Sequence, residues 1–472
     1  MKKNIIDFNT VLKFINIVIL ILTCYSFSVI DNNPYIDSLT LFLGILLSMQ
    51  THLALIYEKV YRNPFIILFT LYMILYFSMR IVTLTIYPQS HVFDRFVYAA
   101  SDSNFSMIFI LISNTFLYFG FFMFKFKNTY NKGAIKLLPL SNFRIYSYIL
   151  IILIFSFGLK SFQGLFGFIH LVFSHKIAII LLLIYYVINK EKISKATIIG
   201  IILFILTIIS YQTIGGSRGG IFAFINIVIL VLLATKDHIY FSKKNFFILV
   251  GILPFLITIL YFTYSLATFN RSQGSSKATV VENIEYAIIS SNQIINNNNM
   301  DKMLSHIAGR IGYFDFSSEI IAHSEEYDKV LNFSVYSKSI IDNILTPGFD
   351  LFDQPKIANS LAFIYGNRGI PKKSLVSQKY QSDQIGIHGE LYALFGYGSV
   401  FLFFIIPYSL SYLYNNISNT NLFMQYIYKY FLLYTFVSII NSFGIDWTLL
   451  YSFILFVSLH IHYNIFFKYK FR

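Results

Sequence analysis

The stretch PFIILFTLYMILYFSMRIVTLTI, residues 64–86, contains a single charged side chain, Arg80. A helix of about 20 apolar residues is long enough to cross the hydrocarbon core of a bilayer, so this stretch predicts a membrane span. The whole chain has the same character, because hydrophobic residues make up 56% of it and charged residues 12%. That charged share is about half of what soluble domains carry, which excludes an ordinary water-soluble fold.

Further apolar stretches predict an all-α polytopic membrane protein with about 12 transmembrane helices. The expected spans cover residues 11–30, 38–57, 64–86, 105–124, 145–159, 177–189, 196–212, 220–235, 245–265, 391–414, 425–443 and 447–465. The first of them is too long for a signal peptide, and no small-residue cleavage site follows it. We therefore expect it to remain as the first transmembrane helix.

The basic residues predict the orientation of these helices. If the spans alternate, one side of the membrane holds 20 of the 36 lysines and arginines. The short loops on the other side hold only Arg95, Lys160, Lys176 and Arg218. Cytoplasmic loops are enriched in Lys and Arg, so we expect both termini to be cytoplasmic. The net charge of +14 then reflects orientation in membrane lipid, and nucleic acid is excluded as a partner.

A long polar stretch, from about Asn270 to Glu390, interrupts the apolar pattern and falls on the outer face. Connections of this length are usually functional or disordered. Met303, Ile307, Ile311 and Phe314 recur at helical spacing, so Asp301 to Val330 predicts an amphipathic helix within an ordered extracytoplasmic cap.

The predicted organisation therefore has three parts. Residues 1–265 carry nine transmembrane helices, residues 266–390 form the extracytoplasmic loop domain, and residues 391–472 carry three more helices. The one cysteine, Cys24, excludes an intrachain disulfide and a cysteine-based metal cage.

Three charged residues fall at the outer ends of spans, where a charge is a functional candidate by default. The alternative to a functional role for Arg80 and Asp446 is that each side chain extends to the membrane–water interface. Arg218 follows Ser217 in GGSRGG, residues 215–220. Glycine allows close backbone approach, and freed N–H groups beside a guanidinium could bind an anion. The alternative for this stretch is a tight hairpin turn.

Four further candidates belong to the long loop. Arg271 follows the ninth span, and Arg310 lies between glycines, where it could pair with Asp315 or Glu319. His388 and Glu390 lie where the chain returns to the membrane. Either could accept a proton, or Glu390 could simply stabilise a helix N-terminus.

Metal and cofactor templates are absent from the sequence. It contains no two-histidine helix motif, P-loop, dinucleotide fingerprint or nucleophile elbow. We therefore expect no cofactor and no metal, and an anionic substrate would have to be bound by arginines.

The twelve spans, the large outer loop late in the chain and the Gly-Ser-Arg-Gly stretch at 216–219 resemble the Wzy-type O-antigen polymerases, the oligosaccharide repeat-unit polymerases. Gly389 to Tyr392, followed by Phe-Gly-Tyr-Gly at 395–398, is similar to the point where their chain returns to the membrane. These enzymes share a fold plan with O-antigen ligases, within the GT-C class of membrane glycosyltransferases.

The resemblance implies a function at the outer leaflet of the bacterial inner membrane. Such enzymes transfer a glycan from an undecaprenyl-diphosphate donor to a lipid-linked acceptor without a metal, and a chain-length regulator is a candidate partner. The resemblance also implies that Arg218, Arg271 and Arg310 bind the diphosphate and that His388 or Glu390 is the base. Arg80, Asp446 and Ser217 are candidates for supporting roles.

Two rival functions remain open at this point. An O-antigen ligase would transfer finished polymer to the lipid A core. A lipid-linked oligosaccharide flippase would form no glycosidic bond, but flippases usually have short loops and inverted repeats.

Overall fold

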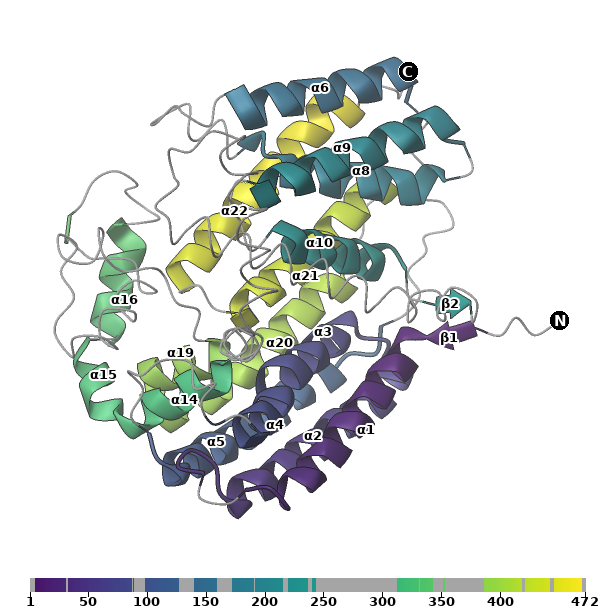
Figure 1. Ribbon diagram of the computed structural model, residues 1–472. Coiled ribbons are helices and arrows are strands. Elements are labelled where there is room, and N and C mark those ends of the chain that lie inside the picture. Colours follow the sequence, from purple (N-terminus) through teal and green to yellow (C-terminus); the bar gives the residue numbers. More distant parts are fainter. Residues whose placement is uncertain are drawn as a thin grey trace, which may run out of the picture.

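Helices dominate the computed structural model of the chain, with one small sheet at its edge (Figure 1). The structure describes residues 5–30, 33–86, 88, 98–126, 140–158, 172–190, 192–214, 220–236, 240–242, 312–330, 332–342, 351–352, 386–417, 421–441 and 445–468.

The N-terminal half supplies two groups of helices. The first comprises α1 (Phe8–Ser26), α2 (Ser38–Tyr61), α3 (Pro64–Met73), the π-helical turn η1 (Ile74–Ser78), α4 (Met79–Ile86) and α5 (Ala100–Phe122). The second comprises α6 (Asn142–Gly158), α8 (His175–Asn189), α9 (Lys195–Ile214) and α10 (Gly220–Thr235).

The C-terminal half supplies the remaining helices. The long loop contributes α14 (Tyr313–Ala322), α15 (Ser324–Val330) and α16 (Phe333–Ile340). The chain then continues as α19 (Gly386–Phe395), the 3-10 turn η4 (Gly396–Ser399), α20 (Val400–Asn415), α21 (Leu422–Asn441), α22 (Ile445–His462) and the π-helical turn η5 (Tyr463–Phe467).

Six of these segments are long and apolar enough to cross a membrane, so the chain is a helical membrane protein. They are Phe8–Ser26, Ser38–Tyr61, Pro64–Ile86, Ala100–Phe122, Gly386–Asn415 and Leu450–Phe467. Four shorter apolar helices lie where the fifth to eighth spans were expected. The expected ninth span, 245–265, lies outside the described residues.

The turn between α2 and α3 shows how the sequence sets helix ends. Arg62 adopts a left-handed conformation with φ 54°, and its N–H donates to Glu58 O at 2.6 Å. Asn63 then caps α3, because its Oδ1 accepts the N–H of Phe65 at 3.0 Å. Pro64, which has no N–H to satisfy, occupies the first turn. Two apolar helices are thereby joined by a turn of two residues.

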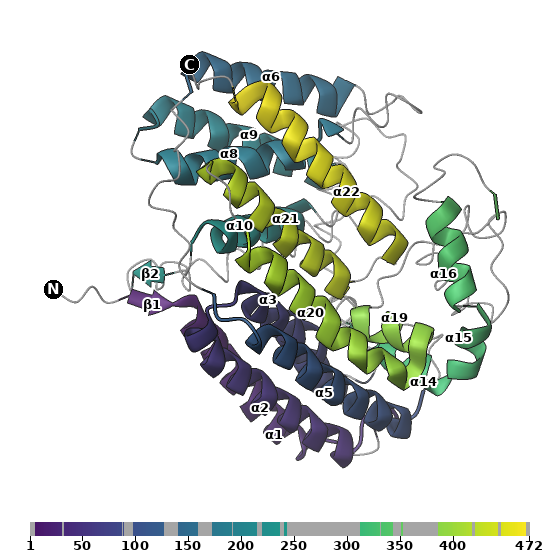
Figure 2. The same cartoon turned by 180° about the vertical axis from the view of Figure 1, so that it is seen from behind.

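The long loop and the small sheet lie at opposite ends of the helices. Strand β1 (Ile5–Asp7) pairs antiparallel with β2 (Tyr240–Ser242), so these two segments share one end. Helices α14, α15 and α16 lie at the other end in both views (Figures 1 and 2). We call these the strand end and the loop end.

In its described part, the helix expected over Asp301 to Val330 is confirmed as helical, but it is divided in two and its first half is not amphipathic. The helix α14 begins at Tyr313, and the chain leaves helical geometry at His323, with φ −118° and ψ 33°, before α15. Every residue from Tyr313 to Ile320 is buried, so α14 presents no polar face to water. Its two serines are bonded inside the protein, because Ser317 Oγ donates to Tyr313 O and Ser318 Oγ donates to Phe314 O, each at 3.0 Å.

Helices α5 and α20 pack closely at Gly120. A Cβ atom added to Gly120 would lie 2.7 Å from Phe404 O and 3.0 Å from Pro407 Cγ. Aromatic contacts continue the packing on either side, with Phe119 and Phe404 ring centroids 5.8 Å apart. Only glycine allows this approach, because the opposing atom is rigid helix backbone.

We expect Gly120→Ala to destabilise the protein by about 1–3 kcal/mol, because the added methyl group must push the helices apart. Thermal unfolding of the detergent-solubilised protein, followed by circular dichroism, measures the effect. Gly398→Ala is the matched control, since a Cβ there meets no atom within 4 Å. Equal unfolding temperatures for the two variants would contradict this account of the packing.

Candidate functional site

The site candidates at the loop end that the structure describes are Arg80, His388 and Glu390. The diphosphate candidates Arg218, Arg271 and Arg310 lie outside the described residues, as does Ser217. Asp446 lies in the first turn of α22, and its side chain is not described. The prediction that the arginines converge on one site therefore remains a prediction.

Helix α19 carries both candidate bases and begins at Gly386. This residue has φ +70°, a conformation that side-chain-bearing residues rarely adopt. A Cβ there would lie 2.5 Å from Tyr72 Oη and 3.1 Å from the ring of Tyr313. Gly386 thus lets α19 start directly against Tyr72 of α3 and Tyr313 of the loop helix α14.

His388 is fully buried in an aromatic cage, which we define as Phe69, Tyr72, Phe77 and Phe403. Its ring lies nearly parallel to that of Phe403, with centroids 4.9 Å apart. Phe77 meets the ring edge-on, with centroids 5.2 Å apart.

One polar group from a neighbouring helix enters this cage. Asn114 of α5 is buried, and its Oδ1 lies 2.9 Å from His388 Nε2. The Nδ2 of the same amide lies 3.7 Å from Met73 Sδ. Among the described residues, no hydrogen-bond partner approaches His388 Nδ1. His388 therefore has one nitrogen bonded to protein and one nitrogen without a protein partner.

Glu390 is also buried, with 1% of its surface exposed. It follows His388 by two residues on the same helix, and such residues project from different faces. The two candidate bases therefore do not form a pair. Either one could receive a proton, but they would do so in different surroundings.

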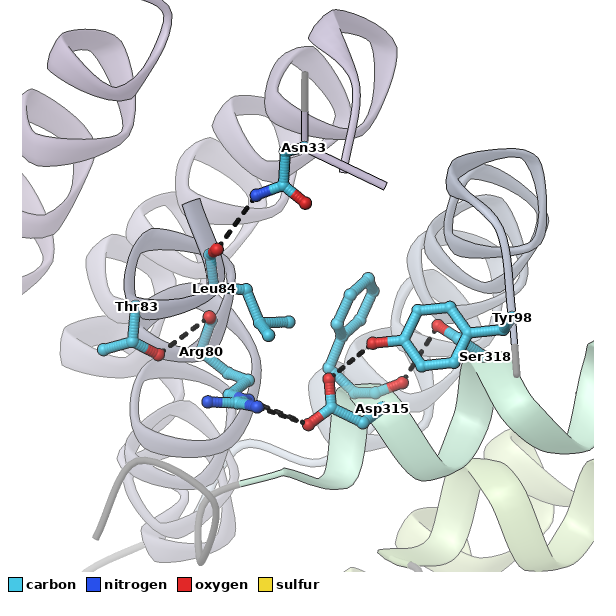
Figure 3. A network of polar contacts seen from close by, with 8 residues as sticks. Asn33, Arg80, Thr83, Leu84, Tyr98, Asp315 and Ser318 are labelled. Atoms are coloured by element: carbon cyan, nitrogen blue, oxygen red, sulfur yellow. Dashed lines mark hydrogen bonds and ion pairs between the residues drawn. The ribbon is translucent and has the colours of Figure 1, made fainter. Parts of the chain in front are cut away.

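Arg80 forms a buried ion pair with Asp315 of the loop helix α14. Its Nη2 and Nε lie 2.8 Å and 2.9 Å from Asp315 Oδ2, and both side chains are fully buried (Figure 3). Tyr98 Oη donates to the other carboxylate oxygen at 2.7 Å. Arg80 is bonded inside the protein, because α14 supplies a buried carboxylate next to it. Asp315, considered above as a partner for Arg310, is bonded to Arg80.

Tyr98 stays a neutral donor in this network. Burial, and after it the negative charge of Asp315, raises the pKa of Tyr98 well above its ordinary value. The phenol therefore keeps its proton at any physiological pH and can hold the carboxylate. Asp315 is thus bound both by Arg80 of α4 and by Tyr98, two residues before α5, and these bonds fix α14 against the helices.

A cluster of tyrosines connects α14 to the cage. The rings of Tyr76 and Tyr313 stack with centroids 4.3 Å apart, and Tyr72 lies 5.2 Å from Tyr76. Tyr76 lies within the π-helical turn η1, and Tyr72 precedes that turn by two residues. Such a distortion of a helix often marks a functional site. Tyr313 is buried and packs on these tyrosines.

Asn114 is not among the residues predicted above, although its sequence position carries a signal. Ser113 and Asn114 form a polar pair inside an apolar span, where polar residues are usually functional. Asp315 and Tyr98 gave no such signal, because neither lies in an apolar stretch. Among the described residues, no group of three His, Cys, Asp or Glu side chains could hold a metal ion.

Comparisons of the chain with protein-family models, curated proteins and solved structures found no match.

We expect Arg80→Met and Asp315→Leu each to destabilise the protein by about 3–5 kcal/mol, because each leaves a buried charge without its partner. The double variant Arg80→Met with Asp315→Leu should be more stable than either single variant, since it leaves no unpaired charge. Thermal and denaturant unfolding in detergent micelles checks both statements.

The matched control is Glu325→Ala, which removes an exposed carboxylate from α15. Its effect should stay within about 0.5 kcal/mol. Additive losses in the double variant would show that the ion pair does not couple α4 to α14.

Proposed function

We propose that this protein is a membrane glycosyltransferase of the Wzy type, which polymerises undecaprenyl-diphosphate-linked oligosaccharide repeat units. The observation that carries the proposal is His388, a buried histidine with one nitrogen bonded to Asn114 and the other without a partner among the described residues. It lies on α19, beside a helix of the long loop. The resemblance of the sequence to the polymerases supplies the substrate class.

The proposed reaction needs a base and a site for a departing anion. A hydroxyl of the acceptor glycan attacks the anomeric carbon of the donor, and its proton passes to His388. The new C–O bond forms as the bond from the anomeric carbon to the diphosphate oxygen breaks, and the lipid diphosphate leaves with that electron pair. Glu390 is the alternative base.

The proposed diphosphate site consists of Arg218, Arg310 and Arg271. Guanidinium groups stabilise the negative charge that develops on a departing diphosphate, and no metal is needed for this. Ser217 and Asp446 are proposed to support the site. Arg80 supports it indirectly, because it binds Asp315 and so holds α14 next to α19.

Access to the base requires a change from this structure, because His388 is fully buried. The proposal therefore includes a rearrangement of the aromatic cage that admits the acceptor hydroxyl. Burial also serves the reaction, since a site without bulk water favours transfer to sugar over hydrolysis.

We propose a GT-C-like arrangement of twelve spans in the bacterial inner membrane, with both termini in the cytoplasm. The pairing of β1 with β2 supports this, because it brings residues 5–7 and 240–242 to one end, as an even number of crossings requires. Basic residues follow the helices that end on that side, among them Arg62, Lys125, Lys190, Lys236 and Lys468. The loop end, with α14 to α16, would then face the periplasm.

A reconstituted assay with lipid-linked repeat units tests the activity. We expect the wild-type protein to convert them into a ladder of polymers, and His388→Gln to reduce the rate by about 100-fold or more. Arg218→Ala and Arg310→Ala should each reduce it by about 100-fold. Glu390→Gln separates the two bases, because only the true base gives the large loss.

Several outcomes would contradict this proposal. Normal rates in Arg218→Ala and Arg310→Ala would exclude the arginine site, and normal rates in His388→Gln would exclude His388 as the base. Transfer of polymer to a lipid A core without chain growth would indicate a ligase. Movement of the lipid-linked unit across vesicles without a new glycosidic bond would indicate a flippase.

The orientation can be checked by labelling single cysteines in intact cells. Cys24 is exposed and is the only cysteine, so Cys24→Ser provides the background. We expect Glu325→Cys, at the loop end, to react with a membrane-impermeant maleimide from outside. Lys192→Cys, near the strand end, should react only after the cells are permeabilised. The reverse pattern would overturn the proposed orientation.

A further inference from the structure

The side-chain amide of Asn114 lies between two groups of different chemistry. Its Oδ1 faces His388 Nε2 at 2.9 Å, and its Nδ2 faces Met73 Sδ at 3.7 Å. A thioether sulfur accepts hydrogen bonds weakly and cannot donate one. The NH2 group of the amide therefore belongs on the side of Met73, and the carbonyl oxygen belongs on the side of His388.

This orientation determines which nitrogen of His388 carries the proton. An amide oxygen is only an acceptor, so the contact at 2.9 Å is favourable only if Nε2 carries hydrogen. With Nε2 unprotonated, two lone pairs would face each other, and a buried Nδ1–H would have no acceptor among the described residues. The doubly protonated ring would place a positive charge inside a cage of four aromatic rings. The neutral Nε2–H form avoids all three costs.

We propose that Asn114 is a positioning residue, which keeps the proton of His388 on Nε2 and thereby leaves the lone pair of Nδ1 as the proton acceptor. The identity of the hydroxyl that gives up this proton rests on the proposed function, whereas the protonation pattern does not. After the transfer, Nε2–H would remain bonded to Asn114, so the same amide also stabilises the imidazolium.

A packing role alone does not account for this arrangement. A buried nitrogen without a partner costs free energy, and an apolar side chain of similar size would fill the cage without that cost. The amide of Asn114 likewise interrupts an apolar helix face that leucine could occupy. The polar pair is explained if the unbonded lone pair of His388 Nδ1 is used in chemistry.

Nitrogen NMR measures the protonation pattern directly. The full-length protein is labelled with 15N-histidine in detergent micelles, and the signals of His388 among the 10 histidines are identified by their loss in His388→Gln. We expect neutral His388 with hydrogen on Nε2. Asn114→Leu should reduce the share of this form, whereas Asn114→Asp should retain it, because a carboxylate oxygen accepts the same bond.

Ser113→Ala is the matched control, since it alters the neighbouring buried polar residue of α5, whose Oγ makes no hydrogen bond to His388. It should leave the His388 signals unchanged. A wild-type protein with hydrogen on Nδ1, or an unchanged pattern in Asn114→Leu, would overturn the role of Asn114.

The catalytic part of the inference is tested in the polymerisation assay. We expect Asn114→Leu to lower kcat by about 10- to 100-fold, with KM changed less than about twofold, because the base is misprotonated while binding is intact. Asn114→Asp should restore most of the rate, and Ser113→Ala should keep it.

The two levels of the proposal fail in different ways. If His388→Gln polymerises normally, the proposed base is wrong and the catalytic use of Nδ1 is overturned, whatever the NMR shows. If His388→Gln is inactive but Asn114→Leu keeps both its kcat and the wild-type protonation pattern, the proposed function stands and the positioning role of Asn114 is overturned.

Discussion

The pairing of one buried arginine with one buried carboxylate organises the loop end of this protein. Arg80 is part of an apolar span, and a guanidinium in that position must find a partner inside the protein. Its partner, Asp315, lies 235 residues further along the chain, in the long polar loop. The loop is therefore not merely a cover over the helices. Helix α14 is drawn against α4 and α5, and Tyr98 fixes the carboxylate from a second direction.

The position of α14 has consequences for the candidate base. Tyr313 is the first residue of α14, and its ring stacks on that of Tyr76, which lies in the π-helical turn η1. The same tyrosine contacts Gly386, where α19 begins, so that α14 helps to define the depth at which His388 lies. The aromatic cage then excludes water, and Asn114 is left as the one described polar side chain with a hydrogen bond to the imidazole. The helix held by the ion pair, α14, thus packs directly against the helix that carries the proposed base, α19.

Polar groups elsewhere in the bundle follow the same physical rule. Asn16 Nδ2 donates to Ser48 O at 2.8 Å and joins α1 to α2, while Gln50 Nε2 donates to Thr115 Oγ1 at 2.8 Å and joins α2 to α5. In lipid, such groups have no water to bind, so they pair across helices and help to select which helices become neighbours. Close approach at Gly120 completes the packing of α5 against α20.

The sequence by itself determined the helical membrane class, the first four apolar helices and the separation of a polar loop from the spans. These properties follow from hydropathy and length, which act locally and do not depend on neighbours. Helix ends such as Asn63-Pro64 were equally local. The sequence also singled out His388, Glu390 and Arg80, because charged or titratable groups beside apolar stretches are costly. Only the tertiary structure decided that Arg80 binds Asp315, that α14 is buried on every side and that Asn114 meets His388. These contacts join residues far apart in the chain, and their partners are selected by three-dimensional packing and desolvation, which no local pattern records.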